Sequence, residues 1–148
     1  MKVFPLDDNV AFSRMPMRSE LDEVSKVFDA VVVLVEEYAP PYPLEEWRKR
    51  NVEVFHSPIP DFSAPSLNQL LEILRWIEAR VAEGKRVLIH CMGGLGRSGT
   101  VAVAWVMYSE DVPLREALRK VRSLRSGAVE TEEQMEVLKE LEMLLRSR

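Results

Sequence analysis

The chain has 148 residues, a formal net charge of −4, and 47% hydrophobic and 30% charged residues. This is the size of one ordinary domain, so we expect residues 1–148 to form a single domain. The composition excludes a disordered chain, and the single cysteine excludes a disulfide scaffold or a cysteine-rich zinc site. An acidic chain has no overall basic field, so nucleic acid is not an expected partner.

No segment fits a membrane span or a secretory signal. The longest apolar runs, such as 30–35 and 101–107, are too short to cross a bilayer, and the first ten residues contain two acids and a proline. We therefore expect a cytoplasmic protein with no membrane partner. Three Asn and two Gln beside many Glu and Arg are typical of heat-adapted proteins, which indicates a thermophilic source.

Strand and helix patterns alternate along the chain. In chain order, the sequence predicts a helix at 19–23, a strand at 30–35, a helix at 43–50, a strand at 52–56, a helix at 66–84, a strand at 86–90, and helices at 99–109, 113–124 and 131–145. Ser66 is the predicted N-cap of the long helix, and Thr131 with Gln134 forms a capping box.

This alternation predicts an α/β fold in which a mostly parallel central sheet is flanked by helices on both faces. In such folds ligands bind where strands end and helices begin. The segment after the third predicted strand, which ends at His90, is therefore the place to look for a site.

The loop after this strand has the sequence HCMGGLGRSGT, from His90 to Thr100, and an apolar helix follows it. Its glycines let the backbone curl, and a curled loop at a helix N-terminus turns several N–H groups toward one point near the positive end of the helix dipole. Such a loop binds an oxyanion such as phosphate, vanadate or sulfate without a net positive charge. The predicted anion-binding residues are Met92, Gly93, Gly94, Leu95, Gly96 and Arg97.

Two side chains would make this loop a reaction centre. Cys91 lies at its start, where the amide dipoles and Arg97 favour the thiolate, which is the nucleophilic form of cysteine. Arg97 can hold two phosphate oxygens in a bidentate contact, for which a lysine is less suited. The thiolate is then placed to attack phosphorus in line with the leaving oxygen.

The pattern His90-Cys91-x5-Arg97-Ser98 resembles the signature of the cysteine-dependent protein tyrosine phosphatases, and the short chain is most similar to the small archaeal members of dual-specificity type. The resemblance covers residues 61–134 well and the first fifty residues only loosely. It implies a protein tyrosine phosphatase-like fold. It also implies a metal-independent phosphatase that needs no cofactor and acts on a phosphorylated protein or peptide.

The resemblance further implies roles for individual residues. Cys91 would form a phosphocysteine, Ser98 would help the sulfur to leave in the second step, and His90 would support the loop. Asp61, on a proline-rich loop, would be the general acid for the leaving group, with a simple turn cap as its alternative. Gln134 is a candidate for positioning the hydrolytic water, with the completion of the helix cap as an equal alternative.

Two rival interpretations of the loop use the same residues. The segment from Gly94 to Gly99 spells GxGxxG, the dinucleotide-binding motif, which predicts a further strand ending in an acidic residue about twenty residues later. The segment 114–121 shows a basic helical pattern instead, which disfavours this alternative. The second alternative is a non-catalytic phospho-residue binder, but such proteins usually lose the cysteine that this chain keeps as Cys91.

Lipid phosphatases of the same family usually carry lysines inside this loop, and this chain has none there. We therefore expect phosphotyrosine in a protein as substrate, with phosphoserine or phosphothreonine as further substrates. The pair Gly93-Gly94 departs from the family pattern, and we expect the extra glycine to let the loop sample an open form that a bound oxyanion disfavours. Glu37 and Tyr38 are expected in a solvated loop, with bracing of Arg97 as the alternative.

Overall fold

A five-stranded sheet forms the centre of the computed structural model, which describes residues 1–148. The strand order is β1-β2-β5-β3-β4, and only the edge strand β1 runs antiparallel to its neighbour. The prediction of a mostly parallel sheet is thus confirmed. The strands are β1 (Phe4–Pro5), β2 (Val10–Ser13), β3 (Ala30–Val33), β4 (Glu53–His56) and β5 (Val87–His90).

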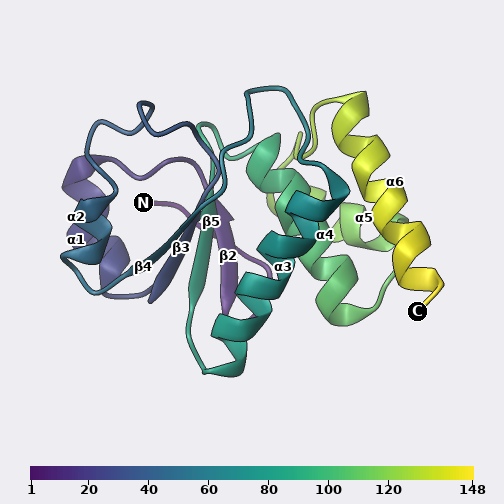
Figure 1. Cartoon of the computed structure of the whole chain (residues 1–148), viewed down its shortest axis with the longest axis horizontal. Coiled ribbons are helices and arrows are strands. Elements are labelled where there is room, and N and C mark those ends of the chain that lie inside the picture. Colours follow the sequence, from purple (N-terminus) through teal and green to yellow (C-terminus); the bar gives the residue numbers. More distant parts are fainter.

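Helices cover both faces of the sheet, as the alternation of elements predicts. Figure 1 shows α1 and α2 on one face and α3, α4, α5 and α6 on the other. Every helix that the sequence predicts is present, with ends shifted by a few residues. The helices are α1 (Leu21–Ser25, after a single 3₁₀ turn at Arg18–Glu20), α2 (Glu45–Arg48), α3 (Leu67–Ala82), α4 (Arg97–Glu110), α5 (Leu114–Leu124) and α6 (Glu132–Arg146).

Two helix starts follow the predicted capping chemistry. The side chain of Ser66 accepts a hydrogen bond from the N–H of Gln69 at the start of α3. At the start of α6, Thr131 and Gln134 form the reciprocal capping box. Because Gln134 is also fully buried, this cap ties the end of the preceding loop to the core.

The sequence did not predict strands β1 and β2, yet β2 lies beside the central strand β5. All four residues of β2 are buried, so the segment does not show the alternation of apolar and polar residues that marks a half-buried strand. Its apolar stretch is also too short to be recognised beside the polar turn before it. Asp7 builds that turn by accepting hydrogen bonds from the N–H groups of Asn9 and Val10, and its other oxygen accepts from the indole of Trp105. A tertiary contact therefore fixes where β2 begins.

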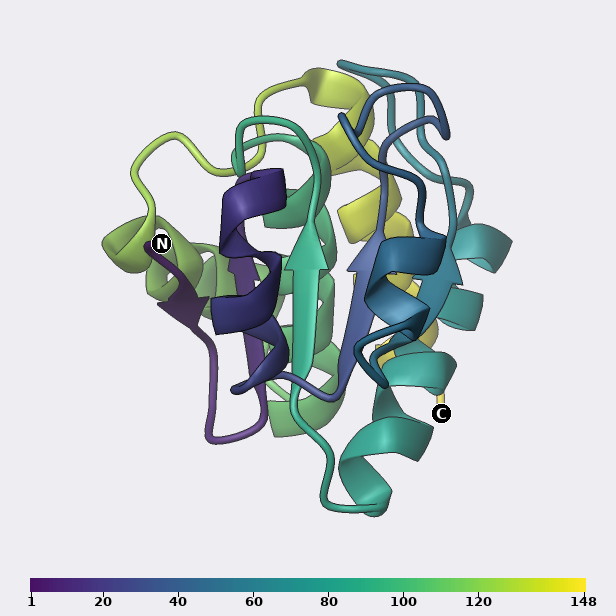
Figure 2. The same cartoon turned by 90° about the vertical axis from the view of Figure 1, so that its left-hand side faces the viewer.

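The strand register brings the ends of the parallel strands to one level. His90 at the end of β5 lies opposite Ser13 of β2 and Val33 of β3, and Val33 lies opposite His56 of β4. The loops that follow β3, β4 and β5 consequently meet at one edge of the sheet, at the top of Figure 2, and the loop before α6 reaches the same edge. This edge is where a ligand site is expected in a parallel α/β fold.

Helix α4 is packed on nearly all sides, because it lies between the sheet and the other helices of its face (Figure 1). Every residue from Arg97 to Met107 is buried. Because the start of α4 is enclosed in this way, water alone cannot accept hydrogen bonds from its first backbone N–H groups. These N–H groups therefore need a defined hydrogen-bond acceptor. None of the helices is long and apolar enough to cross a membrane.

Candidate active site

The loop between β5 and α4 forms one wall of a small cavity of about 180 Å³ at the strand-end edge. Gly94 has φ +76°, and a Cβ atom there would lie 2.8 Å from the backbone nitrogen of Arg14 at the end of β2. Only glycine fits this position without displacing the backbone. The loop is thus held against a strand that the sequence did not predict. The lining residues are Asp61, Phe62, Cys91, Met92, Gly93, Leu95, Gly96, Arg97 and Glu130.

The backbone N–H groups of this loop have no acceptor within the protein. From Met92 to Gly99, no N–H donates to a backbone or side-chain oxygen, and the first such donor is the N–H of Thr100, which reaches the carbonyl of Gly96. A run of unpaired N–H groups beside a helix N-terminus is an unusual feature in a structure whose other buried donors are mostly paired. It is the arrangement that the oxyanion-binding prediction requires.

Cys91 and Ser98 are held together at the base of this loop. The Cys91 Sγ is 3.2 Å from the Ser98 Oγ and forms a hydrogen bond with it, and both residues are buried. Cys91 also lines the cavity, so its sulfur is enclosed but lies beside the space that a phosphate would fill. The hydroxyl of Ser98 is placed to donate to a thiolate at this position.

The guanidinium of Arg97 lies in the same cavity and is braced by the two neighbouring loops. Its Nη1 donates to Glu36 Oε1 at 3.2 Å and to the carbonyl of Ile59 at 2.9 Å, and its side chain is only 4% exposed. With both protons of Nη1 used, Nη2 and Nε remain for a bidentate contact to an oxyanion. Nη2 lies 3.4 Å from Asp61 Oδ1.

The sequence missed Glu36 as the residue that braces Arg97, although it singled out the correct loop. Tyr38 does not contact Arg97: it is 83% exposed, and its hydroxyl donates a hydrogen bond to the second oxygen of Glu36. Glu37 is exposed. The signal that could have identified Glu36 is its position directly after the apolar run 30–35, at the end of a parallel strand.

Asp61 reaches the cavity from the loop between β4 and α3, where the family resemblance implies it. Its carboxylate is 58% exposed, accepts a hydrogen bond from the N–H of Phe62 and lies next to Arg97. Phe62 has φ +63° and its ring is also largely exposed at the cavity wall. A non-glycine residue with positive φ is uncommon, and here it turns the loop so that both side chains line the cavity.

Gln134 lies near the loop but does not line the cavity. Its Oε1 accepts hydrogen bonds from the N–H groups of Glu130 and Thr131, and its Nε2 donates to the carbonyl of Ser63 on the Asp61 loop. Only the second proton of Nε2 is therefore free. This geometry supports the capping alternative, and the water-positioning role stays a prediction.

Glu130 is a cavity-lining residue that no sequence pattern marks. Its carboxylate and the Gln134 amide occupy the space that a side chain at Gly96 would need. The residue before it, Val129, has φ +68° and donates its N–H to the carbonyl of Leu95. A β-branched residue in this conformation is a strained position, which is a signal that only coordinates provide.

His90 contacts the start of the loop from the core side. The ring Nδ1 lies 3.1 Å from the carbonyl of Cys91, to which it donates, and the Nε2 is buried without a partner. Burial is the main cause that lowers the pKa of His90 to about 4, and the positive charge of Arg97 lowers it further. The imidazole is therefore neutral at pH 7, and the supporting role that the family resemblance implies for it stays a prediction.

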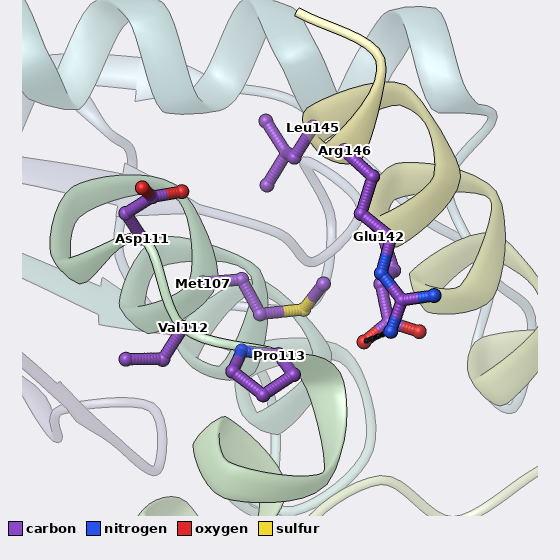
Figure 3. A pocket seen from close by; sticks show the side chains of 7 residues that line it. All are labelled: Met107, Asp111, Val112, Pro113, Glu142, Leu145 and Arg146. Atoms are coloured by element: carbon purple, nitrogen blue, oxygen red, sulfur yellow. Dashed lines mark ion pairs between the residues drawn. The ribbon is translucent and has the colours of Figure 1, made fainter.

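A second cavity shows what a satisfied helix start looks like. It lies where α4, α5 and α6 meet, and Figure 3 shows Glu142 and Arg146 of α6 facing Pro113. The carboxylate of Glu142 accepts a hydrogen bond from the N–H of Leu114 at the start of α5 and pairs with Arg146. This helix start already has its anion, whereas the N–H groups at the start of α4 have none.

The GxGxxG alternative is wrong. No strand follows β5, because α4 leads directly to α5 and then to α6, so the acidic strand end that would hold a ribose is absent. The region after the motif provides helices instead of the second half of a dinucleotide-binding unit.

Comparison with known proteins agrees with the geometry. The family model described as dual specificity phosphatase, catalytic domain, matches residues 19–143. The crystal structure of Tk-PTP in the active form is 72% identical, with a TM-score of 0.94 over 95% of this chain and 96% of that one. A mutant form of Tk-PTP, in which one glycine is replaced by alanine, is 68% identical, with a TM-score of 0.98 over 99% and 98% of the two chains.

A curated relative is more distant. Cyclin-dependent kinase inhibitor 3 from Sus scrofa is 37% identical over 105 residues, which are 70% of this chain and 50% of that protein. The chain spans about half the length of the first curated relatives that it matches. The family match nevertheless covers β3, β4, β5 and every residue that lines the cavity, and the chain belongs to the dual specificity phosphatase family.

Proposed function

We propose that this protein is a phosphatase that hydrolyses phosphate monoesters on proteins through a phosphocysteine. The observation that carries the proposal is the presence of Cys91 and Arg97 in one cavity, beside a run of loop N–H groups without protein acceptors. A phosphate dianion bound there would receive those N–H donors, the Nε of Arg97 and, in place of Asp61, the Nη2 of Arg97. Cys91 is the only cysteine of the chain, so no second site can offer a thiolate.

In the first step the thiolate of Cys91 attacks phosphorus. The sulfur–phosphorus bond forms while the bond from phosphorus to the leaving oxygen breaks, and the charge on the equatorial oxygens is held by the loop and Arg97. The leaving oxygen needs a proton, and Asp61 lies at the cavity wall to donate it. Binding of phosphate replaces the contact between Asp61 and Arg97, which frees the carboxyl for this role.

In the second step water hydrolyses the phosphocysteine. Asp61, now a carboxylate, accepts a proton from the water as its oxygen bonds to phosphorus, and the sulfur–phosphorus bond breaks. The departing thiolate of Cys91 is stabilised by the hydroxyl of Ser98, which lies 3.2 Å away. Gln134 contributes by holding the loop that carries Glu130 and, in this proposal, by offering its free Nε2 proton to the water.

The walls of the cavity favour an aromatic phosphoester. Phe62 is 62% exposed and Met92 is 46% exposed, and both line the cavity around Cys91. Large exposed apolar side chains at a cavity mouth gain contact area when a phenyl ring covers them. We therefore infer that phosphotyrosine is the preferred substrate and that phosphoserine and phosphothreonine are hydrolysed more slowly.

The test compares wild type, Cys91→Ser and Asp61→Asn on a series of aryl phosphates that differ in the pKa of the leaving phenol. Cys91→Ser should lose activity by several orders of magnitude while still binding tungstate. Asp61→Asn should slow poor leaving groups far more than good ones, because only the poor ones need the acid. Full activity of Cys91→Ser would refute the covalent mechanism, and an equal loss on all esters would remove Asp61 from the acid role.

Vanadate inhibition in the presence of a chelator tests metal independence. We expect vanadate to inhibit and the chelator to have no effect on the rate. The remaining alternative, a non-catalytic phospho-residue binder, predicts tungstate binding in wild type with no turnover of any ester.

A further inference from the structure

Three carbonyl groups of the anion-binding residues 92–97 are held by backbone donors outside this segment. In a trans peptide the C=O and the following N–H point in opposite directions, so a donor that holds the carbonyl on the outer side turns that N–H inward. Several loop carbonyls have such a donor. The backbone pairs are Met15 N–H to Met92 O at 3.0 Å, Val129 N–H to Leu95 O at 3.1 Å and Thr100 N–H to Gly96 O at 2.9 Å.

No backbone donor holds the carbonyl of Gly93 or that of Gly94. The oxygen of Gly93 is reached instead by the Nη2 of Arg125 at 3.3 Å, from the C-terminal end of α5. Because the Gly93–Gly94 peptide is flanked by two glycines, its rotation meets the least steric resistance in the loop. A Cβ atom on Gly93 would have no neighbour within 4 Å, so packing does not fix the Gly93 end of the peptide, whereas the Gly94 end lies against the backbone of Ser13 and Arg14.

Arg125 is positioned for this contact by its surroundings. Its guanidinium lies 5.7 Å from the ring centre of Phe4 in β1, and its Nε is buried without a hydrogen-bond partner. An unpaired buried donor has a free-energy cost, which the loop contact and the aromatic face help to offset. The side chain is therefore held against the loop, and it is not among the residues that line the cavity of Cys91.

We propose that Arg125 is a positioning residue that sets the orientation of the Gly93–Gly94 peptide and so directs the N–H of Gly94 toward the phosphate. The inference deepens the proposed function and rests on it for the identity of the anion. Arg125 acts on the anion only through this peptide. When the contact is lost, the peptide rotates between orientations, and the apparent affinity falls in proportion to the remaining competent fraction.

The experiment measures tungstate binding by calorimetry, which does not depend on turnover, together with kcat/KM on an aryl phosphate. Arg125→Met should weaken tungstate binding about tenfold, the size expected when a hydrogen bond from a charged donor is lost. Arg119→Met is the matched control, because Arg119 is exposed on the same helix and has no ion pair or side-chain hydrogen bond. It should bind tungstate as wild type does. Arg125→Gln replaces Arg125→Met if the latter does not fold.

Two further measurements separate peptide orientation from simple attraction of the anion. In a Gly93→Ala background the backbone has fewer alternative orientations, so Arg125→Met should cost about threefold or less. The tenfold effect in the parent background should also persist in about 0.5 M salt, where long-range attraction is largely screened. An equal loss in both backgrounds, a loss that disappears in salt, or an equal effect of Arg119→Met would each overturn the proposal.

The outcomes also separate this proposal from the proposed function. Tungstate binding that does not depend on Arg125, in an active enzyme, refutes the positioning role and leaves the phosphatase standing. Arg125-dependent tungstate binding without turnover refutes the phosphatase and leaves the positioning role standing.

Discussion

Gly94 is the loop position at which the structure tolerates least change. Replacement by alanine keeps a residue at φ +76°, which costs about 1–2 kcal/mol for a residue with a Cβ. The new Cβ would also lie 2.8 Å from Arg14 N and 2.9 Å from Ser13 C, which are backbone atoms that move only with β2. Overpacking of this kind costs about 1–3 kcal/mol. The free energy of unfolding should therefore fall by roughly 2–5 kcal/mol.

For a chain of this size such a loss lowers the Tm by about 5–15 °C. Because the clash is relieved by moving the loop away from β2, tungstate binding should weaken in the folded Gly94→Ala protein as well. Differential scanning calorimetry and tungstate titration below the lower Tm measure the two effects separately.

Gly93→Ala is the matched control for this prediction. Gly93 does not have a positive φ and its added Cβ meets nothing within 4 Å, so the free energy of unfolding should change by less than about 1 kcal/mol. The restricted backbone should instead alter phosphate affinity and turnover, while the fold stays intact. Equal Tm values for the two variants would refute the steric argument. Unchanged kinetics in Gly93→Ala would refute the expectation that this loop samples an open form.

Three further predictions concern the groups around the loop. Glu36→Gln removes the negative charge that braces Arg97 and should lower kcat/KM about tenfold, whereas Glu37→Gln, at an exposed position, should leave kcat/KM unchanged. Equal kcat/KM values of the two variants in steady-state assays would contradict this prediction. Burial lowers the pKa of His90 to about 4 in the folded state, below the ordinary value of 6.5 that applies in the unfolded state. As the pH falls below 6.5, the unfolded state therefore binds the proton before the folded state does, and the free energy of unfolding decreases. The loss from His90 between about pH 6.5 and pH 4 is at most about 3 kcal/mol, and urea titrations should show a flatter pH dependence in His90→Asn. Glu130→Gln removes a negative charge from the cavity wall and should tighten tungstate binding by about two- to fivefold; weaker binding would show that the carboxylate supports the loop instead.

The sequence alone determined the chemistry of the loop. Cys91, Arg97 and Ser98 lie within eight consecutive residues, and a strand before them and a helix after them are recognisable from local hydrophobic patterns. Interactions between residues this near in the sequence depend on local sequence alone. For this reason it was possible to predict the loop, its flanking elements and the alternation of strands and helices. The caps at Ser66 and Thr131 belong to the same class.

The tertiary structure decided what surrounds the loop. Glu36 meets it from the segment after β3, Arg125 and Glu130 meet it from the segment between α5 and α6, and β2 supports it from a third part of the chain. No local pattern marks these residues, because each contact depends on strand order and on the register that aligns the ends of β2, β3, β4 and β5. When the partner of a residue lies far away along the chain, the packing of the whole sheet determines the role of that residue. The general-acid candidate Asp61 was predictable only because the family resemblance supplied this long-range information.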